Sequence, residues 1–318
     1  MRAWHWFSVV VLGVGCGSGS GSAGGDAAPG GDGGGGSDVV VLAADQDHPW
    51  GVAIDDTHVY FTCQGDGTVK RVPKDGGAVE TLASGLTYPR AIGVDDQEVF
   101  WGDGGRVHRA PLAGAAGAPT DWAASSGEVD TLVVTESQVW WLSTSTGVVA
   151  HENKQPNIAT VGSFFREGLP SPIGLAVDDG LVFWTTQGDG SLWSQSTAAL
   201  ADPVALIADD GAGPARIALD ATTVFWVGQA DGTIRKVPRG GGDPTLLGSG
   251  ASGGSFLTAA GTHVYYSNDD AGEVLTVPKT GGDAVVLARD LDTPLGIAAD
   301  ADGVYVATAT GIVRIPAP

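Results

Sequence analysis

Short apolar runs separated by polar, glycine-rich turns follow one another along most of the chain. In the clearest copies, an apolar run ends in Asp, a turn follows, and Val then begins a second run that contains aromatic residues. Residues 52–55 followed by 59–61 form one such copy, and residues 217–220 followed by 224–226 form another. Apolar runs of four to six residues bounded by turn residues are typical of β-strands. The pattern therefore predicts an all-β chain.

The second apolar run recurs at a nearly constant spacing. Its first residue is Val in every copy, and successive copies lie 40 to 43 residues apart. Each unit has room for four short strands, and four strands in about 40 residues is the period of a propeller blade. We therefore expect a seven-bladed β-propeller of four-stranded antiparallel blades. The seven anchor residues are Val59, Val99, Val139, Val182, Val224, Val264 and Val304.

The last unit ends after its third strand and lacks a fourth. The missing strand is found at the other end of the folded region, because residues 38–45 align without a gap on residues 283–290, the fourth strand of the preceding unit. We expect this N-terminal strand to complete the last blade by pairing with residues 311–315. Such a closure removes an exposed strand edge, which would otherwise favour aggregation.

The third unit departs most from the repeat. It keeps Trp140 and Trp141 but loses the Pro-x-Gly and Val-Pro-Lys signatures, and it contains an insertion near residues 153–165. Two interpretations remain open. One is sequence drift without consequence, and the other is a specialised edge for a partner.

The first 37 residues differ in composition from the repeats. Residues 1–16 contain one basic residue, then an apolar run, and end in Gly15 and Cys16. This segment resembles a bacterial lipoprotein signal, with Leu12 four residues before Cys16 rather than three, and the resemblance implies lipidation of Cys16. Residues 17–37 are almost wholly Gly, Ser, Ala and Asp and are expected to form a flexible tether, followed by the propeller over 38–318. We expect a bacterial cell-envelope protein, an outer-membrane or surface lipoprotein, with secretion as the alternative.

The charge balance argues against one class of partner. The chain carries 37 Asp and Glu residues against 16 Lys and Arg residues, a formal net charge of −21. A nucleic-acid-binding protein needs Lys and Arg to neutralise phosphates, so no nucleic acid is expected as a partner. Contact with a membrane is expected only through the lipid anchor. The same net charge keeps a protein dispersed, so we expect a monomer.

The repeat is similar to a family of secreted bacterial propeller repeats. The family's G-T-V-x-K-V-P signature corresponds to residues 232–238, and its T-L-A-S-G signature to residues 81–85. The chain resembles the NHL, YWTD and TolB-like propellers more distantly. The resemblance covers nearly all of residues 38–318 and implies the propeller fold. It implies no particular activity, because fold does not fix function.

Candidate binding residues are those that depart from the repeat in the loops leading into the first strand of each unit. In propellers these loops surround one end of the central channel. A combination of charged and aromatic side chains there suits a polar small molecule, a peptide or a glycan. The alternative is that Arg90 or Arg216 only pairs with Glu128 or Asp130 across the channel. The candidates are His48, Trp50, Tyr88, Arg90, Glu128, Asp130, Arg216 and Phe256.

No catalytic residue, cofactor or metal site is predicted. His48 is the only histidine expected at the channel, and together with Glu128 and Asp130 it matches no known spacing of metal ligands. The sequence contains no P-loop, HExxH, CxxC or nucleophile elbow. The other histidines of the repeats fall at repeated turns or on third strands: His58, His108, His151 and His263.

Two functional hypotheses follow. The first is a surface-anchored module that binds an unknown protein, peptide or glycan and has no catalytic activity. The second is a hydrolase or lyase, similar to lactonase or streptogramin-lyase propellers, that acts at the mouth of the channel. The second requires the candidate side chains to converge on one point within hydrogen-bonding reach.

Overall fold

The computed structural model describes residues 39–112, 120–154, 160–161, 163–178, 180–197, 202–209, 211–253 and 256–318, together with strand β1 (Val11–Leu12). Cys16 and residues 17–37 lie outside the described residues, so the lipidated signal and the tether stay predictions. The described part of the chain contains no helix that could cross a membrane.

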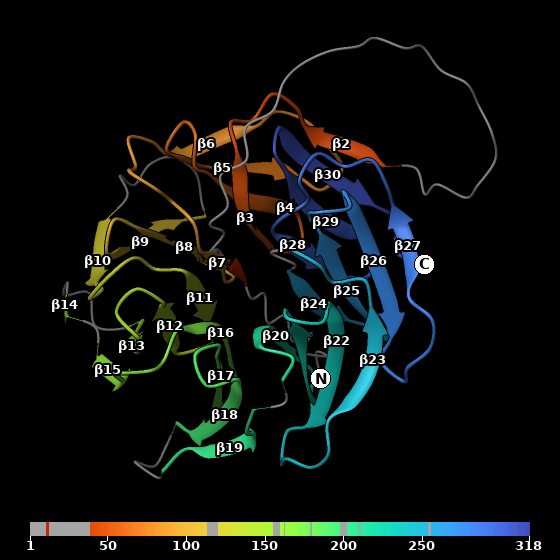
Figure 1. Ribbon diagram of the computed structural model, residues 1–318. Coiled ribbons are helices and arrows are strands. Elements are labelled where there is room, and N and C mark those ends of the chain that lie inside the picture. Colours follow the sequence, from red (N-terminus) through yellow and green to blue (C-terminus); the bar gives the residue numbers. More distant parts are fainter. Residues whose placement is uncertain are drawn as a thin grey trace, which may run out of the picture.

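Seven antiparallel sheets surround a central axis, and each supplies one blade of a propeller (Figure 1). This confirms the predicted blade count. Blade 1 contains β3 (Pro49–Ile54), β4 (His58–Cys63), β5 (Thr68–Pro73) and β6 (Glu80–Ala83). Blade 2 contains β7 (Ile92–Val94), β8 (Glu98–Asp103), β9 (Arg106–Pro111) and β10 (Thr120–Ala124). Blade 3 contains β11 (Thr131–Val134), β12 (Gln138–Ser143), β13 (Val148–Asn153) and β15 (Ser163–Arg166).

The remaining blades repeat this arrangement. Blade 4 contains β16 (Pro172–Val177), β17 (Leu181–Thr186), β18 (Ser191–Ser196) and β19 (Val204–Ile207). Blade 5 contains β20 (Pro214–Leu219), β21 (Thr223–Gly228), β22 (Thr233–Pro238) and β23 (Thr245–Ser249). Blade 6 contains β24 (Leu257–Ala260), β25 (His263–Asn268), β26 (Glu273–Pro278) and β27 (Val285–Ala288). Blade 7 contains β28 (Ile297–Ala299), β29 (Val304–Thr308), β30 (Gly311–Ile315) and β2 (Val40–Ala43).

Blade 7 is assembled from both ends of the propeller sequence, as the repeat predicts. Strand β2 pairs antiparallel with β30, with Val40 opposite Arg314 and Val41 opposite Val313. Figure 1 shows the two strands side by side, β2 in orange and β30 in dark blue. Leu42 is buried in a cluster with Ile312, whereas Val41 faces solvent. The N-terminal strand therefore closes the ring and covers part of its core.

Two short strands extend blades beyond four strands. In the divergent third unit, β14 (Thr160–Val161) crosses to blade 2 and pairs parallel with β10. Strand β1 pairs antiparallel with β11, the innermost strand of blade 3, and also contacts β3. Val11 lies opposite Leu132 and Leu12 opposite Thr131, so these two residues of the predicted signal peptide lie along the inner edge of blade 3.

The aromatic residues of the second strand of each blade form the packing between blades. This strand is covered on both faces by neighbouring blades, which explains why the run is apolar at successive positions rather than at alternate ones. Large side chains at one repeated position fill the space between blades. They are 0 or 1% exposed: Phe61, Trp101, Trp141, Trp184, Trp226 and Tyr266.

In five of the seven blades, an Asp follows the first strand and stabilises the turn after it. Asp55 Oδ1 accepts hydrogen bonds from the backbone amides of Thr57, at 2.6 Å, and His58, at 2.7 Å. Such bonds from an Asp side chain to the next backbone amides satisfy donors that the turn would otherwise leave free. The same arrangement recurs at Asp95, Asp178, Asp220 and Asp300.

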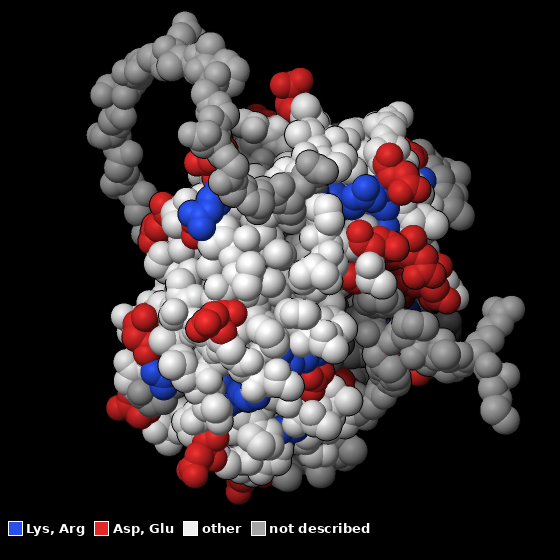
Figure 2. Space-filling view, turned by 90° about the vertical axis from the view of Figure 1, so that its right-hand side faces the viewer, with Lys and Arg blue, Asp and Glu red and all other residues white. Residues whose placement is uncertain are grey.

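In four of these turns the second carboxylate oxygen binds a cation from the next blade. The cation is the Lys or Arg that follows the third strand, and it also lies over an aromatic ring of the neighbouring blade, within 5.3 to 5.9 Å of the ring centroid. On the side of the molecule shown in Figure 2, basic side chains likewise lie beside acidic ones. We call the four ion pairs the seam pairs: Lys74–Asp300, Lys154–Asp95, Arg239–Asp178 and Lys279–Asp220.

At two further seams both members of the pair are missing together. In blade 3 the Asp is replaced by Thr135, and the matching position of blade 4 is Thr197. In blade 6 it is replaced by Ala260, and the matching position of blade 7 is Ala317. At the seam between blades 1 and 2 the position of the cation is Leu112, and the Tyr60 hydroxyl donates to Asp55 Oδ2 at 2.6 Å instead. Each of the five turn carboxylates therefore has a side-chain partner for its second oxygen.

Candidate functional site

Bulges at the start of the innermost strands position two of the candidate side chains. The pairing register between β3 and β4 shifts between Pro49 and Val52, so Trp50 lies in the bulge. The same shift between Pro214 and Ile217 places Arg216 in the equivalent bulge of blade 5. A β-bulge changes the direction in which a strand presents its side chains. The bulge is part of the repeat, and at this bulge Trp50 and Arg216 carry side chains that differ from those of the other blades.

Arg90 lies at the centre of a cluster formed by three blades. Its Nη1 lies 2.8 Å from Asp130 Oδ1 and 3.6 Å from Glu128 Oε2. Its guanidinium lies 4.4 Å from the centroid of the Tyr88 ring and 5.7 Å from that of Trp50. The structure thus brings five predicted residues together. Arg90 therefore forms ion pairs with both carboxylates, as the alternative interpretation of the sequence expected.

Asp130 is held on both of its oxygens. Its side chain is buried, and Oδ2 accepts a hydrogen bond from the backbone amide of Thr144 at 2.8 Å while Oδ1 pairs with Arg90. Burial raises the pKa of Asp130 above its ordinary value, although the bonds from Thr144 and Arg90 oppose this effect. Thr144 belongs to the turn between β12 and β13, and no signal in the sequence marked it.

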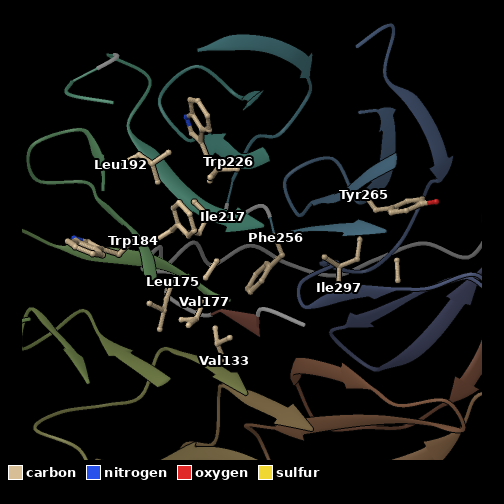
Figure 3. Packing of buried hydrophobic residues seen from close by; sticks show 14 of the residues in the cluster. Val133, Leu175, Val177, Trp184, Leu192, Ile217, Trp226, Phe256, Tyr265 and Ile297 are labelled. Atoms are coloured by element: carbon tan, nitrogen blue, oxygen red, sulfur yellow. The ribbon is translucent and has the colours of Figure 1, made fainter. Parts of the chain in front are cut away.

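Phe256 and Arg216 extend the cluster to blades 5 and 6. The Phe256 ring meets Trp50 edge-on, with centroids 6.3 Å apart and an interplanar angle of 82°. The Arg216 guanidinium lies 4.9 Å from the Phe256 ring centroid, and its Nη1 donates to the Ile173 carbonyl at 3.4 Å. Figure 3 shows Phe256 lying between the innermost strands that carry Ile217 and Ile297. A continuous series of contacts thus runs from Arg216 through Phe256, Trp50 and Arg90 to Asp130.

Arg216 and Phe256 occupy one repeat position, which holds a small residue in the other five blades. At the equivalent Gly174, an added Cβ would lie 2.3 Å from the Ala215 carbonyl oxygen, so that blade has no room for a side chain. Comparison of the units at this one position is the signal that singles out Arg216 and Phe256. The other occupants are Gly51, Ala91, Thr131, Gly174 and Gly296.

His48 does not join the cluster. Its imidazole is 73% exposed, with Nδ1 2.6 Å from Asp47 Oδ1, and it makes no hydrogen bond or ion pair with another candidate among the described residues. Its backbone φ is +52°, and Ser171 and Thr293, which also precede a proline in their own blades, have similar values of +52° and +48°. The left-handed conformation of His48 therefore belongs to the repeat and does not mark a strained catalytic residue.

The structure offers no ready metal centre within its described ranges. No group of three or more His, Cys, Asp or Glu side chains there is arranged to hold an ion. His108 instead stacks on Trp101, with ring centroids 5.7 Å apart, and His151 lies against Trp140 at 4.3 Å. Both histidines pack within their blades, away from the Arg90 cluster.

No family model and no curated protein matches the sequence. Solved structures do match. Virginiamycin B lyase from Staphylococcus aureus superposes with a TM-score of 0.72 at 13% identity, over 88% of this chain and 99% of that chain. The chain has a propeller fold. A catalytically inactive histidine-to-alanine variant of that lyase with quinupristin gives 0.71 at 14% identity, over 88% of this chain and 99% of that chain.

Propellers that are not described as lyases match as well. The WD40 propeller domain of Doa1 gives a TM-score of 0.68 at 16% identity, over 88% of this chain and 97% of that chain. A chain of the nidogen–laminin complex gives 0.56 at 18% identity, over 70% of this chain and 90% of that chain. At these identities the similarity shows the fold alone, and function depends on the residues of the site.

Proposed function

We propose that the protein is an extracytoplasmic binding module that takes a protein, peptide or glycan ligand at the mouth of its channel. The supporting observation is the convergence of Trp50, Tyr88, Arg90, Asp130 and Phe256, which come from four different blades and touch one another in series. Aromatic faces and a fixed guanidinium are common anchors in protein recognition sites.

The side chains at the channel mouth suit recognition better than proton transfer. Asp130 is bound on both oxygens, and Arg90 is paired with carboxylates. A general acid or base needs a proton-exchanging group within hydrogen-bond reach of the substrate. His48 is paired with Asp47 and lies apart from the cluster. The most exposed side chains of the cluster are Tyr88 and Glu128, at 38% and 56%.

The binding hypothesis predicts that ligands depend on Tyr88. Thermal unfolding of the full chain is measured with a library of short peptides and oligosaccharides. A compound that raises Tm should bind Tyr88→Ala about tenfold or more weakly, because an aromatic anchor next to Arg90 is lost. The matched control is Leu246→Ala, whose side chain is also exposed but lies on β23 at the rim of blade 5. Compounds that stabilise the native chain and both variants equally would contradict the proposal.

The alternative function, a lyase, is favoured only by the fold it shares with the streptogramin lyases. Quinupristin is therefore included among the probes and analysed by chromatography after incubation. We expect it to remain unchanged, because no histidine in the described part of the chain makes a hydrogen bond, ion pair or ring contact with the Arg90 cluster. A new product that forms with the native chain and disappears with His48→Ala would instead support the lyase hypothesis.

We also propose that the module is anchored at the cell surface through Cys16. A Gly-rich tether of about 20 residues spans about 25 Å, which places the propeller just clear of a membrane. Mass spectrometry of protein extracted from the membrane fraction should find a chain that begins at Cys16 and carries lipid. A soluble chain that begins after Cys16 would show secretion instead.

A further inference from the structure

Arg216 is a buried cation that has no carboxylate within ion-pair distance among the described residues. It is 2% exposed, and its contacts are the Ile173 carbonyl, 3.4 Å from Nη1, and the face of Phe256. Arg90, in the same cluster, has two carboxylates within 4.0 Å. Burial lowers the pKa of Arg216 to about 9, with Asp130 opposing this effect. The side chain therefore remains charged at neutral pH.

The hydrogen bond to Ile173 does not account for an arginine at this position. Thr131, at the equivalent position of blade 3, already donates its Oγ1 hydroxyl to the same Ile173 carbonyl at 3.3 Å. Blades 4 and 7 have glycine at this position and form the same fold. Burying an unpaired charge is costly, and an apolar residue of similar volume is often neutral or stabilising in its place. The fold therefore does not require an arginine at this position.

The Arg216 guanidinium carries donors that no described residue accepts from. A guanidinium carries five N–H donors, and only one hydrogen bond of Arg216 is made to a described residue. These donors lie beside the Phe256 ring, which in turn contacts Trp50.

We propose that Arg216 anchors the carboxylate of a small organic acid whose apolar or aromatic body packs on Phe256 and Trp50. This inference rests on the proposed binding function and names the class of ligand. The planar fork of a guanidinium matches a carboxylate with two parallel hydrogen bonds. A singly charged anion suits the site better than a phosphate dianion, because Asp130 lies nearby and the chain has a net charge of −21.

The test is thermal unfolding of the full chain with sodium benzoate, compared with sodium chloride and sodium phosphate at equal ionic strength. Saturating benzoate should raise Tm by about 3 °C. Arg216→Met should abolish this rise without lowering the Tm of the free protein, since it replaces a buried unpaired charge with an apolar side chain of similar length. Arg289→Met is the matched control, since Arg289 is 67% exposed on the outer part of blade 6. It should retain the full response.

Three results would overturn the carboxylate anchor. The first is a response to benzoate that persists in Arg216→Met, or none in the native chain. The second is stabilisation by phosphate and not by benzoate. The third is a Tm of free Arg216→Met several degrees below that of the native protein, which would make Arg216 a structural residue. A library compound that still depends on Tyr88 in any of these cases would preserve the binding function and reject only the anchor.

Discussion

A chain that lacks residues 38–45 will aggregate or be digested rapidly, because blade 7 then ends in the unpaired edge of β30. Leu42 and Ala43 are 6% and 3% exposed, so the deletion also uncovers part of the core that they share with Ile312. An open edge next to exposed apolar surface is a template for pairing with another chain. Size-exclusion chromatography and limited proteolysis measure the two outcomes. A truncated chain that stays monomeric and melts at the native temperature would rule out closure by β2.

Two substitutions in β2 test whether the buried face of this strand, rather than any change to it, stabilises the protein. Leu42→Ala removes a buried side chain and should lower the free energy of unfolding by about 2–5 kcal/mol. Val41→Ala, at the neighbouring position that is 61% exposed, should change it by less than about 0.5 kcal/mol. Equal effects of the two substitutions would show that β2 is not packed against the core.

Lys74→Met will destabilise the protein by about 3–5 kcal/mol, because it leaves the carboxylate of Asp300 buried and without its cation. Lys74 and Asp300 are 6% and 8% exposed and form the seam pair between blade 1 and blade 7. Lys74 also lies over the Tyr305 ring, 5.4 Å from its centroid. Urea unfolding of the native chain and the variant gives the difference in free energy.

Two further variants test whether burial of the charge is the cause. Lys279→Met breaks a seam pair whose side chains are 18% and 26% exposed, so its cost should be smaller. The double variant Lys74→Met with Asp300→Asn should recover much of the loss, because the Asn oxygen can still accept from the turn amides that Asp300 binds. Similar losses for Lys74→Met and Lys279→Met, or no recovery in the double variant, would contradict this account.

The fold could be predicted from the sequence because each blade is built from consecutive residues that repeat the same pattern of apolar runs and turns. Residues 38–45 could be assigned to blade 7 from their match to residues 283–290 alone, and β2 does pair with β30. The seam pairs could not be assigned in this way. Lys74 and Asp300 are 226 residues apart, and the repeat explains Asp300 fully as the residue that stabilises its own turn. The second oxygen of that carboxylate acquires its partner only when the blades pack.

The candidate binding residues stay a prediction, but their contacts can be compared with the repeat that singled them out. Departures from the repeat led to Trp50, Arg90 and Phe256, and the structure places these three side chains in one contact series. His48 departs from the repeat equally, yet its side chain turns to Asp47 because the residue before the proline adopts the repeat's left-handed conformation. Thr144 contributes through its backbone amide, which every residue type except proline carries, so its identity gave no indication.

Strand β2 has a second consequence, a mechanical one. The strand that closes the ring also leads toward the predicted tether, so under the proposed anchoring any pull from a membrane would enter the domain at Val40. The pairs Val40–Arg314 and Val41–Val313 would then bear that load before any other part of blade 7. A force large enough to separate these few backbone pairs would open the propeller at its seam.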